Sequence, residues 1–144
     1  MRFPRYATPL LMALWLTGCA AKDTTQPSLY TRLGGMPTLE NVVENMLYRV
    51  ADDPEIVVFF ANTNIDHFAE AFAIQLCDIS DGPCQYEGPP MDRAHQHMGI
   101  NDAHFNRVVE YLADALEEEG VPLAEQNELL GRLAPLHDDI MRLQ

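Results

Sequence analysis

The sequence predicts an all-α fold, and three features support this prediction. Apolar residues recur at intervals of three and four, which places them on one face of a helix. No segment shows a convincing alternation of apolar and polar residues, which is the pattern of a half-buried strand. Glycine, proline and polar clusters divide residues 28–144 into segments too short for a simple bundle, so we expect about five or six helices in an irregular arrangement.

The first half of this region should contain three helical segments. We expect a short turn over residues 28–33, a sharp entrance at Gly34-Gly35 and Pro37, and a helix over residues 38–52 that Thr38 caps. An apolar block at residues 56–60 and a helix over residues 66–79 follow. The apolar stripes of the two longer helices carry Leu39, Val42, Val43, Met46, Leu47 and Val50, and then Phe68, Phe72, Leu76 and Ile79.

The second half should begin with a loop over residues 80–90 and a short helix around His95 that ends at Gly99. Asn101 then caps a long helix that ends at Gly120-Val121-Pro122. Pro135 should bend the last helix, because proline cannot donate a helical hydrogen bond. The buried faces of these two helices carry Phe105, Val108, Val109, Leu112, Ala115 and Leu116, and then Leu130, Leu133, His137, Ile140 and Met141.

The size and composition of the chain fit one globular domain. It has 144 residues, of which 47% are hydrophobic and 22% are charged. The formal net charge of −13 at pH 7 disfavours binding to nucleic acid or to anionic lipid headgroups. The same charge would attract a basic redox partner such as a cytochrome, although most acidic surfaces have no such role.

Residues 1–18 have the pattern of a bacterial signal peptide. Arg2 and Arg5 give a positive start, residues 9–17 are apolar, and the run ends in Leu16-Thr17-Gly18-Cys19. This end resembles the lipobox of bacterial lipoproteins, which implies cleavage before Cys19 and a lipid on that residue. The alternatives are an uncleaved signal anchor and a chance match, but the apolar run is too short to span a bilayer as a helix.

On this interpretation residues 19–27 are the lipidated cysteine and a short polar tether. In such lipoproteins Ala20 favours the outer membrane, where the protein would face the periplasm. Removal of residues 1–18 takes away two arginines and no acid, so the net charge would change from −13 to −15. The domain that remains, residues 28–144, would be strongly acidic.

Cys77 and Cys84 remain once Cys19 is assigned to the lipid. Export would bring them into an oxidising compartment, where a disulfide can persist. The turn Asp81-Gly82-Pro83 lies between them and could bring their Cα atoms within bonding range, so we favour a disulfide. Two buried thiols and a cysteine and histidine metal site stay open as alternatives.

His95 is the residue that most requires an explanation. On a helix, Met91 and Met98 lie on its face at i−4 and i+3, while His97 is rotated by about 200° and cannot share a ligand with it. A histidine among apolar neighbours is more often a hydrogen-bonded core residue than a metal ligand. Helical spacing alone leaves both interpretations open.

Three apolar surfaces could meet around His95. They are the face of Met91 and Met98, the Phe59-Phe60 block, and the face of Phe68, Phe72 and Gln75. Together they would form a flat and mostly aromatic slot with one nitrogen donor. Haem requires such walls, together with a neutral imidazole for its iron. A well-packed core would show the same spacing, so the pattern does not separate the two.

A resemblance to a known family bears on this question. Residues 28–141 resemble the group I truncated haemoglobins, in which a two-over-two helical sandwich holds haem b. The matching features are Leu29-Tyr30-Thr31-Arg32-Leu33-Gly34-Gly35, Asp53-Pro54, Phe59-Phe60, Gly82-Pro83, Tyr86-Glu87-Gly88, Met91, Ala94-His95, Met98-Gly99-Ile100, Phe105 and Pro135. The resemblance implies that the chain binds a diatomic gas, namely O2, NO or CO.

The resemblance also implies roles for individual residues. His95 matches the proximal ligand, whose Nε2 binds the iron, and Phe60 matches the aromatic residue that packs on the porphyrin from the distal side. Phe68 and Phe72 match distal helix positions above the iron. The other cofactor-binding positions are Met91, Ile100, Phe105, Val108 and Leu112.

The distal side departs from the family pattern. Many members carry a tyrosine there that donates to oxygen, but Leu47 takes this position, and Tyr48 falls one residue late and faces outward. Phe72 replaces a common distal glutamine, which leaves Gln75 as the polar candidate, ahead of His67 and Tyr86. Each missing hydrogen bond is worth about 0.5 to 1.5 kcal/mol, so oxygen should be released, or the haem oxidised, more readily.

These observations predict a lipid-anchored oxygen-binding haem protein. Oxygen transport, NO dioxygenation and electron transfer are all compatible with the resemblance, and turnover would need an electron donor that the chain does not contain. One alternative is a non-haem divalent-metal lipoprotein that uses His67, His95, His97 and His104, although His95 and His97 diverge on a helix. The other is a structural helical lipoprotein whose slot is filled by side chains.

Overall fold

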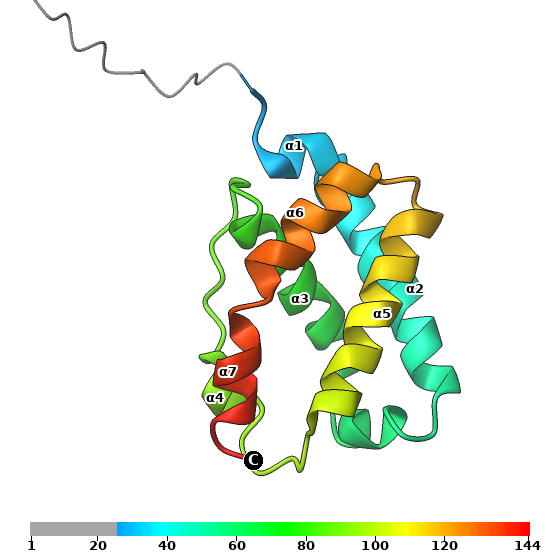
Figure 1. Ribbon diagram of the computed structural model, residues 1–144, viewed down its shortest axis with the longest axis vertical. Coiled ribbons are helices and arrows are strands. Elements are labelled where there is room, and N and C mark those ends of the chain that lie inside the picture. Colours follow the sequence, from blue (N-terminus) through cyan, green and yellow to red (C-terminus); the bar gives the residue numbers. More distant parts are fainter. Residues whose placement is uncertain (1–25) are drawn as a thin grey trace, which may run out of the picture.

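The computed structural model describes residues 26–144 and shows only helices and loops in this range, which confirms the all-α prediction (Figure 1). The elements are α1 Leu29–Leu33, α2 Met36–Asp52, η1 Val57–Phe60, α3 Ile65–Ile79, α4 Met91–Ala94, α5 Asp102–Glu118, α6 Leu123–Leu133 and α7 Leu136–Met141, of which η1 is a 3-10 helix. The predicted signal peptide and Cys19 lie outside the described residues. Within residues 26–144, no helix is both long and apolar enough to cross a bilayer.

The long helices form two packed pairs, which is the two-over-two sandwich that the resemblance implies. Helix α2 packs against α3, helix α5 packs against α6, and α2 also lies against α5 (Figure 1). Each of these helices turns an apolar stripe inward, where burial stabilises it. The core residues are Leu39, Val42, Val43 and Met46 of α2, Ala73, Leu76 and Cys77 of α3, Leu112, Ala115 and Leu116 of α5, and Leu129 of α6.

Helix α2 begins earlier than expected, so Thr38 is not its N-cap. The helix starts at Met36 after Gly35, which has a φ of 77°, and Pro37 lies in its first turn. Proline suits this position because its ring fixes a helical φ and the first turn needs no N–H donor. Thr38 instead lies against Gly34, where a Cβ would come within 2.3 Å of the threonine Oγ1.

Helix α4 is shorter than predicted, and this changes the setting of His95. The helix ends at Ala94, and His95 is its C-cap with a φ of −112°. His97 then adopts the left-handed conformation at a φ of 58°, so the chain leaves the helical path before Met98 and Gly99. The expectation that Met98 flanks His95 at i+3 on one helix was therefore wrong, as was a helix end at Gly99.

Pro135 separates two helices where the sequence predicted one bent helix. Helix α6 ends at Leu133, and α7 begins at Leu136, directly after the proline. A proline ring both lacks the N–H and clashes with the preceding turn, which ends the hydrogen-bond ladder here. The break frees α7 to lie beside α4 (Figure 1).

The loop after α3 is fixed by several contacts. Cys77 and Cys84 are joined by the disulfide that the sequence favoured, with their Cα atoms 5.8 Å apart. Asp81, in the turn between the two cysteines, takes a left-handed φ of 61°. Aspartate tolerates this conformation better than most residues. Its carboxylate binds Arg132 of α6 at 2.6 Å, so the loop is also held to the second layer.

A buried carboxylate links α2 to α5. Asp53, at the end of α2, accepts a hydrogen bond from the Tyr111 hydroxyl at 2.6 Å and another from the Glu55 backbone N–H at 2.8 Å. The Arg107 guanidinium lies 3.6 Å away. These contacts hold the pKa of Asp53 below its ordinary value. The hydrogen bond from Tyr111 is the main cause, and the backbone N–H and the arginine add to it.

The depressed pKa of Asp53 gives a prediction for acid stability. The carboxylate contributes stability above its unfolded-state pKa of about 3.9, and this contribution is lost as the pH falls through the lower folded-state pKa. Asp53→Asn should therefore lower the free energy of unfolding at pH 7, and its difference from the wild type should shrink towards pH 2. Urea unfolding at both pH values measures this, with the exposed neighbour Asp52→Asn as an unchanged control. An equal deficit at both pH values would contradict it.

Candidate functional site

The His95 imidazole is oriented by the backbone of its own helix. Its Nδ1 lies 2.9 Å from the Met91 carbonyl oxygen, and the residue is half-buried. A carbonyl can only accept, so Nδ1 carries the proton and donates it. In the neutral ring Nε2 then keeps its lone pair. A fixed imidazole with a free Nε2 lone pair is the form of histidine that binds a metal.

Three phenylalanines from two elements form an aromatic wall. Phe60 of η1 meets Phe68 of α3 edge to face, with ring centroids 5.1 Å apart and an interplanar angle of 87°. Phe68 also contacts Phe72, one helical turn later, with ring centroids 5.7 Å apart. Edge-to-face contacts of this kind fix ring orientation as well as burying area. The structure thus brings the predicted distal aromatics together.

The predicted pocket residues keep apolar surface that the protein does not cover. Leu112 is 4% exposed and belongs to the core, but the others are only half-buried. These half-buried residues are Leu47, Phe60, Phe68, Phe72, Met91, Ile100, Phe105 and Val108. Side chains that filled their own slot would be largely buried, as the core stripe is. The partial exposure instead fits a flat apolar group lying against these walls.

The polar candidates for the distal side lie in different places. Gln75 is buried, and its Nε2 donates to the Met91 sulfur at 3.4 Å, which joins α3 to α4. Tyr48 is 63% exposed and donates to Glu44, which raises the pKa of the tyrosine. Leu47 packs on the core instead. The outward direction predicted for Tyr48 therefore agrees with its exposure.

The other two polar candidates do not join this group. His67 is exposed at the start of α3, where its backbone N–H donates to Asn64. The Tyr86 hydroxyl donates to the Pro89 carbonyl at 3.3 Å within its own loop, and burial raises the pKa of Tyr86. Gln75 is thus the one buried polar side chain of the set.

His137 contacts the predicted pocket residue Phe105, which the sequence did not reveal. Its ring meets Phe105 edge to face at 4.9 Å, and its nitrogens lie 3.1 Å from Asp138 and 3.0 Å from Asp102. These two carboxylates, Asp138 first, raise the pKa of His137. The residue counted only as part of an apolar stripe in the sequence, because nothing there shows that α7 turns back to the start of α5.

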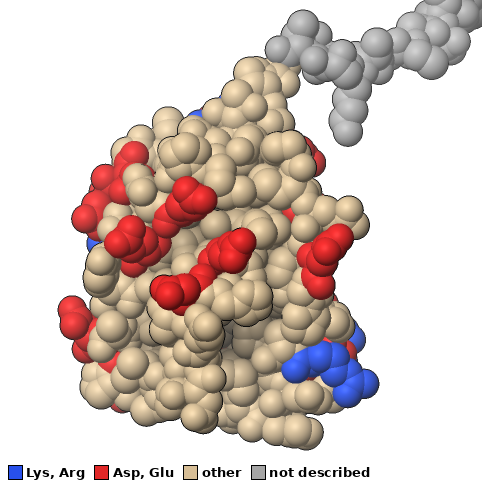
Figure 2. Space-filling view, turned by 180° about the vertical axis from the view of Figure 1, so that it is seen from behind, with Lys and Arg blue, Asp and Glu red and all other residues tan. Residues whose placement is uncertain are grey.

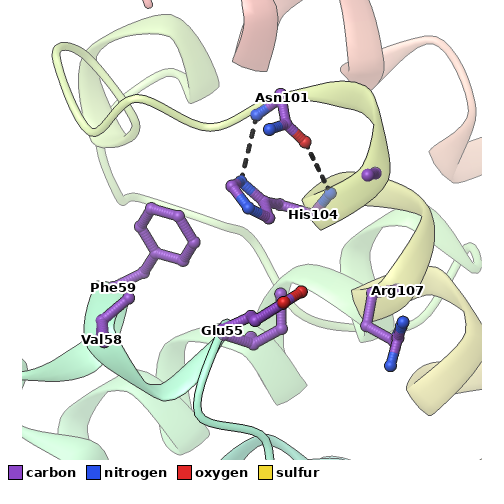
Figure 3. A pocket seen from close by; sticks show the side chains of 8 residues that line it. Glu55, Val58, Phe59, Asn101, His104 and Arg107 are labelled. Atoms are coloured by element: carbon purple, nitrogen blue, oxygen red, sulfur yellow. Dashed lines mark hydrogen bonds between the residues drawn. The ribbon is translucent and has the colours of Figure 1, made fainter.

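A separate hollow of about 500 Å³ lies between η1 and the start of α5 (Figure 3). Phe59 and Val58 line one side, and Asn101, His104 and Arg107 line the other. The His104 ring contacts Phe59 in a tilted arrangement, with ring centroids 4.9 Å apart, and accepts a hydrogen bond from the Asn101 backbone N–H. The contacts of the His104 ring are therefore with Phe59 and Asn101.

The histidines do not gather into a metal site. In residues 26–144 no group of three or more histidine, cysteine, aspartate or glutamate side chains is arranged to hold a metal ion. His67 and His97 are exposed on different segments. A divalent-metal site built from His67, His95, His97 and His104 is thus unsupported by the described part of the chain.

Acidic side chains are spread widely over the face seen from behind, which is also hollowed in one place (Figure 2). Seen from behind, acidic side chains spread over the upper and middle parts of the molecule (Figure 2). The lower part, which carries α4, α7, η1 and the start of α5, is hollowed (Figures 1 and 2). These elements also carry acidic residues, namely Asp92 of α4, Asp102 of α5, and Asp138 and Asp139 of α7.

Comparisons with known proteins point in one direction. The family model described as bacterial-like globin matches residues 28–142. The group 1 truncated haemoglobin of Mycolicibacterium paratuberculosis is 43% identical over 117 residues, which cover 78% of this chain and 83% of the relative. The group 1 truncated haemoglobin of a Nostoc species is 30% identical over 114 residues, covering 79% and 97%.

Solved structures give the same result. The crystal structure of the truncated haemoglobin from Tetrahymena pyriformis in its Fe(III) form aligns with a TM-score of 0.76 at 31% identity, covering 79% of this chain and 97% of that one. The 2/2 haemoglobin from a Synechococcus species, with covalently attached haem, aligns with a TM-score of 0.76 at 25% identity, covering 81% and 99%. Both similarities extend over the whole helical sandwich.

Proposed function

The chain belongs to the bacterial-like globin family, and we propose that it is a truncated haemoglobin that holds haem b through His95 and binds O2, NO or CO. The hydrogen bond from His95 Nδ1 to the Met91 carbonyl carries this proposal, because it presents a neutral Nε2. When bound, the haem iron would supply an open coordination position for a diatomic gas. The fold and the cofactor are those of the family.

The half-buried apolar residues supply the walls for the porphyrin. Phe60, Phe68 and Phe72 would cover it from the distal side, and Met91, Ile100, Phe105 and Val108 would line the rest. Burial of this surface would contribute about 25 cal/mol per Å² to retention of the cofactor. Leu112 would support the wall from within the core.

The distal side would offer few hydrogen bonds to the gas. Leu47 and Phe72 are apolar, and Tyr48 faces solvent. Gln75 remains the proposed donor, because it is buried and its amide is held only by a thioether, which is a weak acceptor. A gas ligand with negative character would be the better acceptor.

We further propose that residues 1–18 direct export, and that the domain is anchored through a lipid on Cys19 and faces the periplasm. The lipobox-like sequence Leu16-Thr17-Gly18-Cys19 supports this proposal, and so does the Cys77–Cys84 disulfide, because disulfides persist in exported proteins. An outer-membrane location follows from Ala20 in such lipoproteins.

Catalysis would require an electron donor from outside the chain. NO dioxygenation and electron transfer both fit a gas-binding haem protein in the periplasm. The acidic surface would favour a basic donor, since opposite charges accelerate association (Figure 2). Gas binding itself needs no such partner.

Removal of the His95 side chain tests the ligand assignment. His95→Gly should lose the Soret band of the reconstituted protein, and added imidazole should restore it by occupying the vacated space. Absorption spectra with and without imidazole measure this. The exposed His97→Gly serves as the matched control and should bind haem like the wild type. An unchanged His95→Gly spectrum would show that another residue holds the iron.

Replacement of Gln75 tests the distal donor. Gln75→Leu should speed the dissociation of O2 from the ferrous protein by about two- to tenfold, the equivalent of one hydrogen bond. Stopped-flow displacement of O2 by CO measures the rate. Tyr48→Phe removes a solvent-exposed hydroxyl and should have no effect. A wild-type rate in Gln75→Leu would rule out this donor.

Substitution of Cys19 tests the anchor. In bacterial cells, Cys19→Ser should abolish incorporation of labelled fatty acid and release the domain from the membrane fraction, because serine cannot carry the thioether-linked lipid. Fractionation and mass spectrometry of the amino terminus measure both effects. A chain without residues 1–18 provides the unexported control. Membrane association that survives Cys19→Ser would contradict lipid anchoring.

A further inference from the structure

The segment that carries His95 lacks support from its own secondary structure. Helix α4 has four residues, which is about one turn, and isolated helices of this length are unstable. Beyond it, residues 95–100 are irregular, and His97 adopts a left-handed φ of 58°. The backbone polar groups of this stretch must therefore find partners elsewhere.

The residues that follow α7 supply these partners. The Gln144 carboxamide donates from Nε2 to the His95 carbonyl at 2.8 Å and accepts from the Ile100 backbone N–H at 3.0 Å through Oε1. The Leu143 carbonyl accepts from the His97 backbone N–H at 2.9 Å. One side chain thus spans both ends of the irregular stretch, and its neighbour holds the middle.

The donating segment is itself fixed in place. Helix α7 lies beside α4, and Arg142 forms an ion pair with Asp92 of α4 at 3.7 Å (Figure 1). The Gln144 Nε2 also donates to the Ile140 carbonyl of α7. His137 binds Asp102, which ties α7 to the start of α5. The Gln144 carboxamide is therefore bonded both to α7 and to the segment that carries His95.

We propose that Gln144 is a positioning residue for His95, an inference that rests on the proposed function. It fixes the His95 carbonyl, while the Met91 carbonyl fixes the ring through Nδ1. Backbone and imidazole are then both restrained, and Nε2 is aimed in one direction. This role needs a donor and an acceptor on one planar group, which an amide provides and a carboxylate does not.

Two substitutions at Gln144 separate the effect of its hydrogen bonds from the effect of its side-chain size. Gln144→Ala removes both hydrogen bonds, and Gln144→Glu keeps an acceptor for the Ile100 N–H but sets an acceptor against the His95 carbonyl. Gln96→Ala is the matched control, because Gln96 is exposed on the same segment. All are made in the full chain and reconstituted with hemin.

Three measurements test this role of Gln144, one in the apoprotein and two in the haem-bound protein. Hydrogen exchange of the Ile100 amide in the apoprotein should be faster in Gln144→Ala than in the wild type. Haem loss to excess apomyoglobin should rise by about two- to tenfold in Gln144→Ala, the scale of a lost hydrogen bond, and also rise in Gln144→Glu. The iron–histidine stretching band of the ferrous proteins should shift or broaden in both variants and stay unchanged in Gln96→Ala.

The outcomes distinguish this inference from the proposed function. If the wild type binds hemin while haem loss and the iron–histidine band are the same in all four proteins, Gln144 does not position His95 and only this inference falls. If the wild type takes up no hemin, the proposed function is wrong, and so is this inference. A changed stretching band together with faster haem loss in both Gln144 variants supports the positioning role.

Discussion

The hydrogen bond between His95 Nδ1 and the Met91 carbonyl is the interaction on which the site depends. It fixes which ring nitrogen carries the proton and where the other one points. The bond spans one turn of α4, so a very short helix is enough to make it. Helix α4 is in turn held by α7 and the residues after it, so the position of His95 depends on a segment that is distant in the sequence.

The distal side is built on a different principle. Its aromatic wall is fixed by ring contacts among Phe60, Phe68 and Phe72, and not by hydrogen bonds. Phe68 and Phe72 also pack against the core, to which α2 and α3 contribute their buried stripes. An apolar surface of this kind, together with a single oriented nitrogen, would suit a cofactor whose chemistry lies in its metal and whose area is mostly hydrocarbon.

Helical spacing predicted most of the long helices, and the family resemblance implied a site of which Phe60, Phe68 and Phe72 lie in contact with one another. Where the predicted helix ends were wrong, local chemistry gives the reason. Thr38 has the side chain of an N-cap residue, but Gly35 and Pro37 start α2 earlier. Pro135 ends a helix that the apolar stripe continues through. The roles of His137 and Gln144 depend on α7 folding back beside α4, and contacts between residues so far apart in the chain leave no periodic signal in the sequence.

The central claim is that one oriented imidazole binds one haem per chain. Titration of the apoprotein with hemin, followed by absorbance at the Soret maximum, measures this most directly. The account predicts a steep rise that stops at one hemin per chain. A linear increase without an end point, as free or loosely adsorbed hemin gives, would contradict it.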